Sequence, residues 1–355
     1  MSRGTIRIGV VGAGTIVRTR HAPGFQAIPD VELAGVCNRR RESSARAARE
    51  LGIPKTYGSW EDVIQDPMID AVLIGAWPYL HCPVTLAALD AGKHVLTQAR
   101  MAMNAREAQR MLDKTRETPS LTAMVVPSPY GLAGEEFVRS LIAEGFIGAL
   151  REVHVDGLSD DLADPATPMG WRQKTRYSGF NMLTLGILYE TVLRWVPPAN
   201  RVVAYASKLI PERFDPENGR TKAVGTPDSI QVLTTHQDDS VGVYRLSAVT
   251  WGPRTMSVAL HGSDGSIYYD LLNDEIRGIR RGETSPRALT IPADLRGGWN
   301  VEADFVAAIR DDRHITHTDF ATGARYMQFT EAVARSSRHQ IPVMLPLREF
   351  SNPSL

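Results

Sequence analysis

The sequence predicts an α/β protein with a doubly wound parallel sheet over residues 1–126 and an α+β domain with a large, mainly antiparallel open sheet over residues 127–355. A chain of 355 residues is long enough for about two domains. Up to residue 126, short apolar runs alternate with helix-compatible runs, which is the pattern of parallel βαβ units. After Pro127-Ser128-Pro129, strand patterns follow one another through short turns, as in antiparallel hairpins.

The overall composition excludes several classes of protein function. Hydrophobic residues make up 43% and charged residues 23% of the chain, as in ordinary globular proteins. Basic and acidic residues number 40 each, so we expect no nucleic acid and no membrane surface as a partner. No run approaches the roughly 20 apolar residues of a membrane span, and the first residues pass straight into a strand pattern without a signal peptide. With only Cys37 and Cys82, we expect a reducing, cytoplasmic compartment.

The strands of the first domain are predicted from short apolar runs, and its helices from capping residues and helix-compatible runs. Its strands are expected at 6–11, 31–36, 71–74, 94–96 and 121–126. Its helices are expected from the first strand's turn to residue 26 and at 42–51, 59–64, 83–91 and 104–117. Ser59 is a suitable N-cap, and Asn104 with Glu107 three residues later resembles a capping box. Gly52 and Gly92 end the preceding helices.

The second domain should contain a run of hairpin-connected strands and a few helices. Its helices are expected at 132–143, 180–195, 300–310 and 319–337. Its strands are expected at 201–209, 229–236, 241–250, 256–262 and 266–271. The short turn Asp238-Asp239-Ser240 joins two of these strands, and such a short connection requires antiparallel pairing.

The turn after the first strand carries two closely spaced glycines, Gly12 and Gly14. In dinucleotide-binding turns, the first glycine permits a tight turn and the second lets the backbone approach a diphosphate at the helix N-terminus. The third position of this fingerprint is Val17, which implies slightly wider packing of the helix on the strand. The expected dinucleotide-binding residues are Gly12, Gly14, Thr15 and Ile16. The alternative is a turn that binds no ligand.

The end of the second strand indicates which dinucleotide is preferred. An acidic side chain there would accept hydrogen bonds from the ribose of NAD, but this chain reads Asn38-Arg39-Arg40-Arg41. Because the planar guanidinium group suits a phosphate, we expect NADP, with NAD as the alternative cofactor. A solvated basic turn is the other interpretation. The expected cofactor-binding residues are Asn38, Arg39 and Arg40.

Polar and aromatic residues follow the strand at 71–74, at the sheet edge where ligands of such folds bind. Trp77 could stack on the nicotinamide ribose or on a sugar face. His81 either contacts the cofactor or is a capping or packed imidazole. We expect Ala76, Trp77 and His81 to bind the cofactor. The remaining histidines are scattered, so we expect no metal site.

Several motifs in this order resemble the glucose–fructose oxidoreductase / inositol dehydrogenase / rhizopine catabolism (Gfo/Idh/MocA) family. They are Gly12-Ala13-Gly14, Pro78-x-x-His81, Gly92-Lys93-His94-Val95-Leu96, His261-Gly262-Ser263-Asp264-Gly265-Ser266-Ile267, and Asp304-Phe305 with Ala308-Ile309-Arg310. The resemblance covers almost the whole chain. It implies a Rossmann domain, a nicotinamide cofactor, sugar-, polyol- or related carbonyl substrates, and homodimers or homotetramers formed through the C-terminal sheet.

The chain departs from this family where the family handles protons. The usual Glu-Lys-Pro is replaced by Gln98-Ala99-Arg100, so the lysine position holds an alanine. The usual Asp-x-Gly-x-His becomes Thr184-Leu185-Gly186-Ile187-Leu188, which keeps only the glycine. We therefore expect non-standard proton-handling residues.

Oxidising an alcohol requires a group that takes the hydroxyl proton or stabilises an alkoxide. The candidate catalytic residues are Arg100, Gln98, Tyr189 and Glu190, and Gln98 is also a candidate for cofactor binding. The candidate substrate residues are Arg100, Trp171, Arg172, Asn181 and Thr184. Three of these residues have a structural alternative: Glu190 could pair with Arg194, Tyr189 could pack in the core, and Asn181 could cap a helix.

Three hypotheses about function remain open. The first is an NAD(P)-dependent oxidoreductase that acts on a sugar-like or polyol-like substrate. The second is a redox-neutral lyase or glycosidase-type enzyme, in which the hydride returns to the substrate. The third is a sensor or scaffold protein that binds a dinucleotide without turnover.

Overall fold

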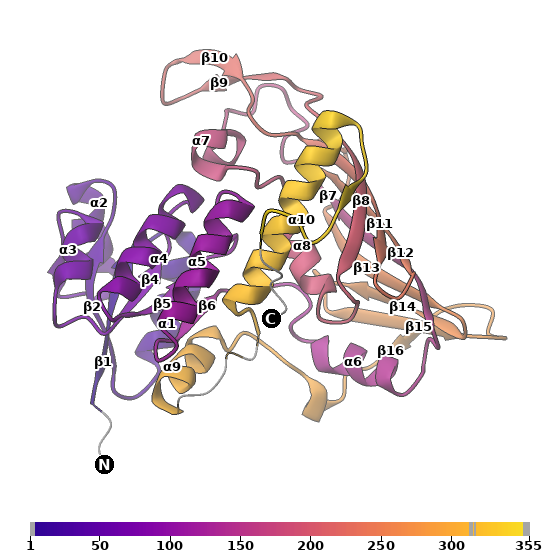
Figure 1. Ribbon diagram of the computed structural model, residues 1–355, viewed down its shortest axis with the longest axis horizontal. Coiled ribbons are helices and arrows are strands. Elements are labelled where there is room, and N and C mark those ends of the chain that lie inside the picture. The colour runs from indigo at the N-terminus through magenta and orange to yellow at the C-terminus, as the bar shows by residue number, and fades with distance from the viewer. Residues whose placement is uncertain (1–3, 312–314, 316, 351–355) are drawn as a thin grey trace. The chain divides into compact units, whose positions relative to one another are not determined.

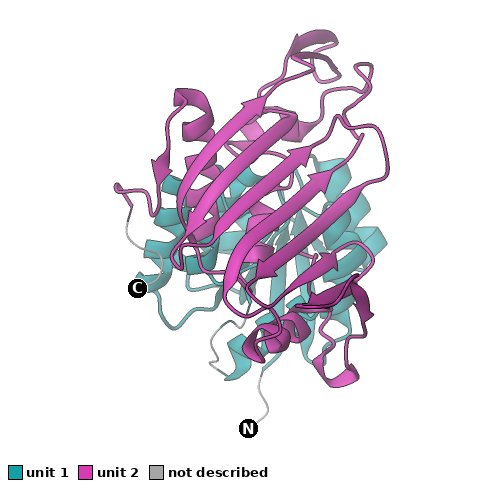
Figure 2. Cartoon of the chain, turned by 90° about the vertical axis from the view of Figure 1, so that its right-hand side faces the viewer, with its two compact units in different colours: residues 1–127, 300–324, 353–355 teal, residues 128–299, 325–352 magenta. Residues whose placement is uncertain are grey.

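The computed structural model describes residues 4–311, 315 and 317–350. Its backbone contacts divide the chain into two compact units (Figure 2). Unit 1 contains the described residues up to Pro127 and those of Asn300–Ala324, and unit 2 contains Ser128–Trp299 and the described residues from Arg325 on. The sequence predicted one domain over 127–355, whereas the described residues of 300–324 cluster with unit 1. The reason is packing, because Phe305 is fully buried with its ring 6.4 Å from that of Phe25.

Unit 1 is built on the expected parallel sheet (Figure 1). The strand order is β3 (Lys55–Thr56), β2 (Val31–Cys37), β1 (Ile6–Val11), β4 (Ala71–Ile74), β5 (His94–Thr97) and β6 (Ala123–Val125). Its helices are α1 (Ala22–Gln26), α2 (Arg41–Leu51), α3 (Trp60–Gln65), α4 (His81–Asp90), α5 (Ala105–Glu117) and α9 (Val301–Asp311). The order reverses between β1 and β4, and ligands of doubly wound sheets bind beside such a point.

Helix caps in unit 1 agree with the sequence signals, with one difference. Ser59 Oγ accepts the Asp62 N–H at 3.2 Å while Asp62 accepts the Ser59 N–H at 2.9 Å, a complete capping box. Asn104 Oδ1 accepts the Glu107 N–H at 2.9 Å, as expected. The Glu107 carboxylate, however, accepts the Met103 N–H at 3.0 Å, so the reciprocal half of the box is displaced by one residue.

Unit 2 contains a nine-stranded sheet. Its order is β16 (Arg287–Leu289), β15 (Glu275–Arg280), β14 (Gly265–Asp270), β13 (Thr255–Gly262), β7 (Leu150–Leu158), β12 (Val241–Ser247), β11 (Ser229–His236), β8 (Ala199–Ser207) and β17 (Val343–Met344). All neighbours are antiparallel except β7 and β12, which makes the sheet mixed. Among the strands that the sequence did not predict is β7, where charged and polar residues occupy much of the strand and hide its short apolar alternation.

The remaining elements of unit 2 cover one face of this sheet or extend from it. They are α6 (Glu135–Ala143), α7 (Thr175–Ser178), α8 (Leu185–Val192), α10 (Phe320–His339, most of it in this unit) and the hairpin of β9 (Glu212–Asp215) with β10 (Arg220–Ala223). The helix expected at 180–195 begins only at Leu185, because Gly179 and Leu183 adopt positive φ angles of 62° and 45°. No helix among the described residues is long and apolar enough to cross a membrane.

The other face of the unit 2 sheet is open toward the viewer in Figure 2. Four large apolar side chains on three neighbouring strands are exposed there: Val203, Tyr205, Leu233 and Val241. We call these four residues the apolar sheet patch. Contiguous exposed apolar surface of this kind is typical of an interaction site.

Candidate functional site

The turn after β1 packs directly against the turn after β4. Gly12 has a φ of +91°, and a Cβ atom there would lie 2.5 Å from the backbone nitrogen of Ala76. A Cβ atom on Gly75 would lie 2.3 Å from the carbonyl oxygen of Gly12. Two glycines therefore allow the two turns to touch backbone to backbone, at the point where the strand order reverses.

Gly14 is exposed, and a Cβ atom there would meet nothing closer than 3.7 Å. Its backbone is therefore accessible to a ligand, and packing alone would allow a larger residue at this position. Thr15 and Ile16 follow at the start of the helix and are also exposed, Ile16 with 47% of its surface. The helix then passes through a π-helical turn at Val17–His21 before α1, which the sequence did not indicate.

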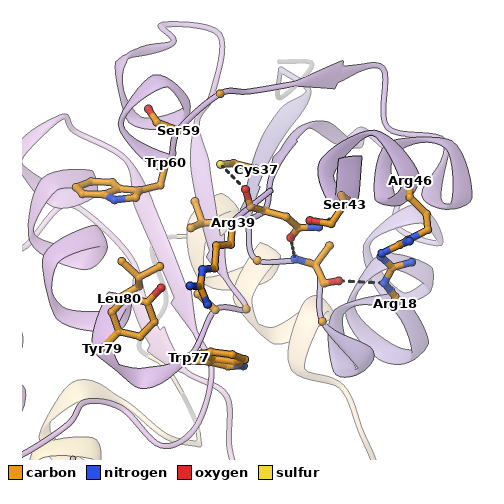
Figure 3. A pocket seen from close by; sticks show the side chains of 18 residues that line it. Arg18, Cys37, Arg39, Ser43, Arg46, Ser59, Trp60, Trp77, Tyr79 and Leu80 are labelled. Atoms are coloured by element: carbon orange, nitrogen blue, oxygen red, sulfur yellow. Dashed lines mark hydrogen bonds between the residues drawn. The ribbon is translucent and has the colours of Figure 1, made fainter. Parts of the chain in front are cut away.

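A cavity of about 570 Å³ opens beside these turns (Figure 3). Six residues expected to bind a cofactor line it: Gly12, Gly14, Asn38, Arg39, Ala76 and Trp77. Five others expected to do so are not among its lining residues: Thr15, Ile16, Arg40, His81 and Gln98. Further lining residues were not expected from the sequence, and those with polar or aromatic side chains are Arg18, Cys37, Ser43, Arg46, Ser59, Trp60 and Tyr79.

The end of β2 is tied to the glycine turn by Asn38. Its Oδ1 atom accepts the Ala13 N–H at 2.7 Å, and its Nδ2 atom donates to the Ser43 carbonyl at 3.0 Å. Its backbone N–H donates to Ser44 Oγ at 2.8 Å. The amide is thus used in shaping the turn, and no carboxylate side chain lines the cavity among the described residues.

Basic side chains face the cavity from three elements. Arg39 points into the cavity, and Arg46 reaches it from α2 (Figure 3). Arg18 donates through Nε to the Ala13 carbonyl at 3.0 Å and forms a close ion pair with Glu50, which offsets its charge. Arg40 is the N-cap residue of α2 and does not line the cavity, so the second arginine facing it from this region is Arg46.

His81 joins two loops at the carboxyl edge of the sheet. It is buried, with Nε2 at 2.9 Å from the Ala76 carbonyl and Nδ1 at 3.0 Å from the Arg100 carbonyl. Burial lowers the pKa of His81, which favours the neutral imidazole. Its position corresponds to the packed imidazole considered as the alternative from the sequence.

The segment after β5 carries the altered family motif. The Gln98 N–H donates to the Ile74 carbonyl at 3.0 Å, which places Gln98 beside Gly75. The Ala99–Arg100 peptide is cis, and Arg100 is buried with 6% of its surface exposed. The Gln98 side-chain nitrogen contacts His21 Nε2, and His21 Nδ1 lies 2.5 Å from Glu302 Oε1. No local sequence signal could have found this cluster, because Glu302 lies 281 residues after His21.

Two candidate catalytic residues in unit 2 make structural contacts. Burial raises the pKa of Tyr189 to about 12, its hydroxyl accepts the Ala199 N–H at 3.0 Å, and its ring stacks on Phe329 at 3.6 Å. Glu190 accepts the Ser128 N–H at 2.9 Å and pairs with Arg194 at 2.8 Å. These contacts match the structural alternatives, and the catalytic roles stay predictions.

The candidate substrate residues of unit 2 lie around α7 and α8. Asn181 is buried and donates to the Ser178 carbonyl at 2.8 Å, so it does not cap α8. Thr184 is the N-cap residue of α8 but makes no side-chain cap. The guanidinium of Arg172 lies 4.4 Å from the ring centre of Trp171. The described residues contain no group of three or more histidine, cysteine, aspartate or glutamate side chains arranged to hold a metal.

Two family models match the chain. The model described as "Oxidoreductase family, NAD-binding Rossmann fold" matches residues 6–125. The model described as "GFO/IDH/MocA C-terminal domain" matches residues 136–268. Together they cover the cavity described above and most of unit 2.

Curated relatives and solved structures show the same similarity. The chain is 25% identical to levoglucosan dehydrogenase of Pseudarthrobacter phenanthrenivorans over 96% of this chain and 98% of the relative. It is 32% identical to 1,5-anhydro-D-fructose reductase of Ensifer adhaerens over 54% and 56% of the two chains. The structure of levoglucosan dehydrogenase in complex with NADH and L-sorbose superposes with a TM-score of 0.86 at 23% identity, covering 97% of this chain and all of that one. This superposition shows a shared fold.

Proposed function

Because the chain belongs to the Gfo/Idh/MocA family of oxidoreductases, we propose that it is an NADP-dependent enzyme that interconverts a hydroxyl and a carbonyl group on a carbohydrate-like substrate. The observation that carries the cofactor preference is the pair Arg39 and Arg46 at a cavity whose lining, among the residues that the structure describes, includes no carboxylate. A ribose phosphate offers the charge and the acceptor oxygens that guanidinium groups bind.

The described residues fit a nicotinamide dinucleotide. The exposed backbone of Gly14, Thr15 and Ile16 would hold the diphosphate, and Arg39, Arg46 and Ser43 would hold the ribose phosphate. Trp60, Trp77 and Tyr79 offer aromatic faces for flat rings. The bound cofactor would accept or donate a hydride, while the chain orients it and handles the proton.

Arg100 and Gln98 are the polar residues that we propose next to the reacting groups. Arg100 stays protonated, so its role would be to stabilise a developing alkoxide or to bind a substrate carboxylate. Trp171, Arg172, Asn181 and Thr184 remain our proposed substrate contacts. The names of the relatives support small sugars and anhydrosugars as the first substrates to assay.

One observation favours a second candidate function, a dinucleotide-binding protein without turnover. Ala99 and Leu188 stand where the resemblance implies a lysine and a histidine, and Leu188 is fully buried. Turnover assays with a panel of sugars, polyols and anhydrosugars decide between the two. Substrate-dependent reduction of NADP supports the enzyme, and saturable cofactor binding without turnover supports the second candidate.

The cofactor proposal is tested by titrating stripped protein with NADPH and with NADH while following the fluorescence of the reduced nucleotide. We expect NADPH to bind at least about tenfold more tightly, because a charge-assisted contact contributes about 1.5–3 kcal/mol. Equal affinities, or tighter binding of NADH, would refute the preference. The absence of saturable binding of either nucleotide would refute the whole proposal.

We further propose that the apolar sheet patch is covered by a second copy of the chain, giving a homodimer or homotetramer. Its four exposed side chains share one face of three adjacent strands, because Leu233 pairs with Val203, Tyr205 follows two residues after Val203, and Val241 pairs with Thr235, two residues after Leu233. Two buried thiols without disulfides, Cys37 and Cys82, support a cytoplasmic location.

A further inference from the structure

His21, Glu302 and Gln98 come from three separate elements of unit 1 and meet at the carboxyl edge of its sheet. We propose that Glu302 and His21 are positioning residues that hold the Gln98 amide in one orientation, so that its side-chain oxygen accepts a hydrogen bond from a bound ligand. This inference rests on the proposed function for the identity of the ligand, but its structural part can be tested without any cofactor.

The contact between Glu302 and His21 determines where the imidazole carries its hydrogen. His21 is 0% exposed and Glu302 is 4% exposed, and Nδ1 lies 2.5 Å from Oε1. Ionised carboxylate oxygens only accept hydrogen bonds, so Nδ1 must donate and carry the hydrogen. In the neutral imidazole, Nε2 is then a pure acceptor.

The Gln98 amide nitrogen faces this acceptor. An amide nitrogen only donates, so the Glu302–His21–Gln98 chain forms two hydrogen bonds that run in one direction. If Nε2 carried a hydrogen, the Gln98 amide would have to turn its oxygen toward the ring to accept it, and that oxygen would no longer be available to a ligand. The tautomer of His21 therefore decides which end of the amide faces away from the ring.

The local backbone explains how the pair comes together. His21 is the last residue of the π-helical turn before α1, and π turns inside helices often occur at functional sites. Gly24 lies one turn further, where a Cβ atom would be 2.7 Å from the Glu302 carboxylate. The glycine therefore leaves the space that Glu302 occupies. Glu302 lies in the first turn of α9, where the helix dipole favours a negative charge.

The consequence for Gln98 is that its oxygen is left for a ligand. Gln98 is half-buried, and among the described residues its side-chain oxygen has no hydrogen-bond partner. Gln98 lies beside Gly75, which lines the cavity. A neutral oxygen of this kind takes an N–H or O–H donor, which the proposed function supplies as the nicotinamide carboxamide or a substrate hydroxyl.

The first experiment measures the tautomer of His21 by NMR of the imidazole nitrogens in the cofactor-free protein at neutral pH, with the signals assigned from their loss in His21→Phe. We expect a neutral ring with hydrogen on Nδ1. In Gln98→Glu, which restores the usual family residue, two carboxylates would flank the ring, and we expect hydrogen on both nitrogens. A wild-type ring with hydrogen on Nε2, or a Gln98→Glu spectrum unchanged from wild type, would overturn the proposal.

The second experiment measures what the Gln98 oxygen binds. Gln98→Leu should weaken the binding of one ligand by about three- to tenfold, which is the contribution of one neutral hydrogen bond. Loss of affinity for NADPH but not for its acetylpyridine analogue, which lacks the carboxamide N–H, identifies the cofactor. A raised substrate KM with unchanged NADPH affinity identifies a substrate hydroxyl. If neither changes, the oxygen binds no ligand and the inference is wrong.

A double-mutant cycle separates positioning from general destabilisation. His21→Phe removes the acceptor for Gln98 and should cause the same loss as Gln98→Leu, with no further loss in the double variant. His236→Asn is the matched control, because His236 is also buried but lies in unit 2, where its ring nitrogens form hydrogen bonds with the hydroxyl groups of Thr234 and Ser240. Additive losses, or the same loss in the control, would contradict a positioning role. Failure of wild type to bind either nucleotide would refute the proposed function and leave the tautomer result standing.

Discussion

The carbonyl oxygen of Gly12 lies only 2.3 Å from the place where Gly75 would carry a Cβ atom. Neighbouring Gly14, by contrast, has space for a methyl group, since the nearest atom is 3.7 Å from the ideal Cβ position. The two glycines therefore serve different purposes: Gly75 permits packing of the two turns, and Gly14 leaves an accessible backbone.

The first prediction uses this difference. Gly75→Ala should lower the free energy of unfolding by about 1–3 kcal/mol, because the added methyl group forces the two turns apart. Gly14→Ala should keep the stability of wild type and weaken NADPH binding by obstructing the backbone that the diphosphate would approach. Denaturant unfolding and cofactor titration of both variants provide the measurements. A destabilised Gly14→Ala protein with normal affinity would contradict this assignment.

A second prediction concerns the arginines around α2. Arg39→Ala and Arg46→Ala should each weaken the binding of NADPH by about tenfold or more and leave the binding of NADH nearly unchanged, because only NADPH carries the ribose phosphate. Arg40→Ala is the matched control, since this side chain is exposed but does not line the cavity. An equal loss of both nucleotides in the Arg39 variant, or selective loss of NADPH in the control, would show that the phosphate binds elsewhere.

The third prediction decides the role of Glu190. Its carboxylate is buried and pairs with Arg194, whose guanidinium also lies 3.4 Å from the Glu135 carboxylate. Glu190→Gln should therefore weaken the ionic contacts of Arg194 and lower the free energy of unfolding by about 1.5–3 kcal/mol, the contribution of a hydrogen bond to a charged group. Glu190→Gln with Arg194→Met should recover part of that loss. These free energies come from urea unfolding. Normal stability combined with a large fall in kcat would instead make Glu190 a catalytic residue.

Acid sensitivity of unit 2 supplies the fourth prediction. The Lys174 ammonium, 2.6 Å from Asp215, holds the pKa of that carboxyl well below its usual range. At about pH 4, the Asp215 carboxyl takes up a proton in the unfolded chain but stays ionised in the folded chain. The contribution of the Lys174–Asp215 pair to stability is therefore present above about pH 4 and is lost as the pH falls further. Asp215→Asn should flatten the fall of Tm in acid. Asp160→Asn, at an exposed carboxyl of the same unit, should leave the acid profile as in wild type.

The fifth prediction concerns assembly. Leu233→Lys places a charge within the apolar sheet patch and should convert the proposed oligomer to a monomer, as measured by light scattering after size exclusion. Met68→Lys is the control, because Met68 is 55% exposed against 58% for Leu233 but lies on unit 1. A wild-type protein that is monomeric at all concentrations would remove the assembly proposal.

The sequence predicted five of the six strands of unit 1 because buried parallel strands are continuous apolar runs, and β4 coincides with the expected 71–74. It did not predict β3, whose two residues are polar and exposed. It failed for β7, whose polar residues hide its pairing with distant partners. Arg46 was missed for a geometric reason, since the phase of α2 decides which arginine faces the cavity. The His21–Glu302 pair depends entirely on how α9 packs, which no local pattern encodes.

The return of α9 to unit 1 has a consequence for synthesis on the ribosome. All six strands of the first sheet have been translated by Val125, yet the partners of His21 and Phe25, Glu302 and Phe305, follow only about 180 residues later. A nascent chain released before residue 302 would lack both Phe305, which packs near Phe25, and Glu302, which contacts His21. The packing of unit 1 is therefore complete only after most of the polypeptide has been synthesised, and truncation after Pro127 should yield an aggregation-prone fragment.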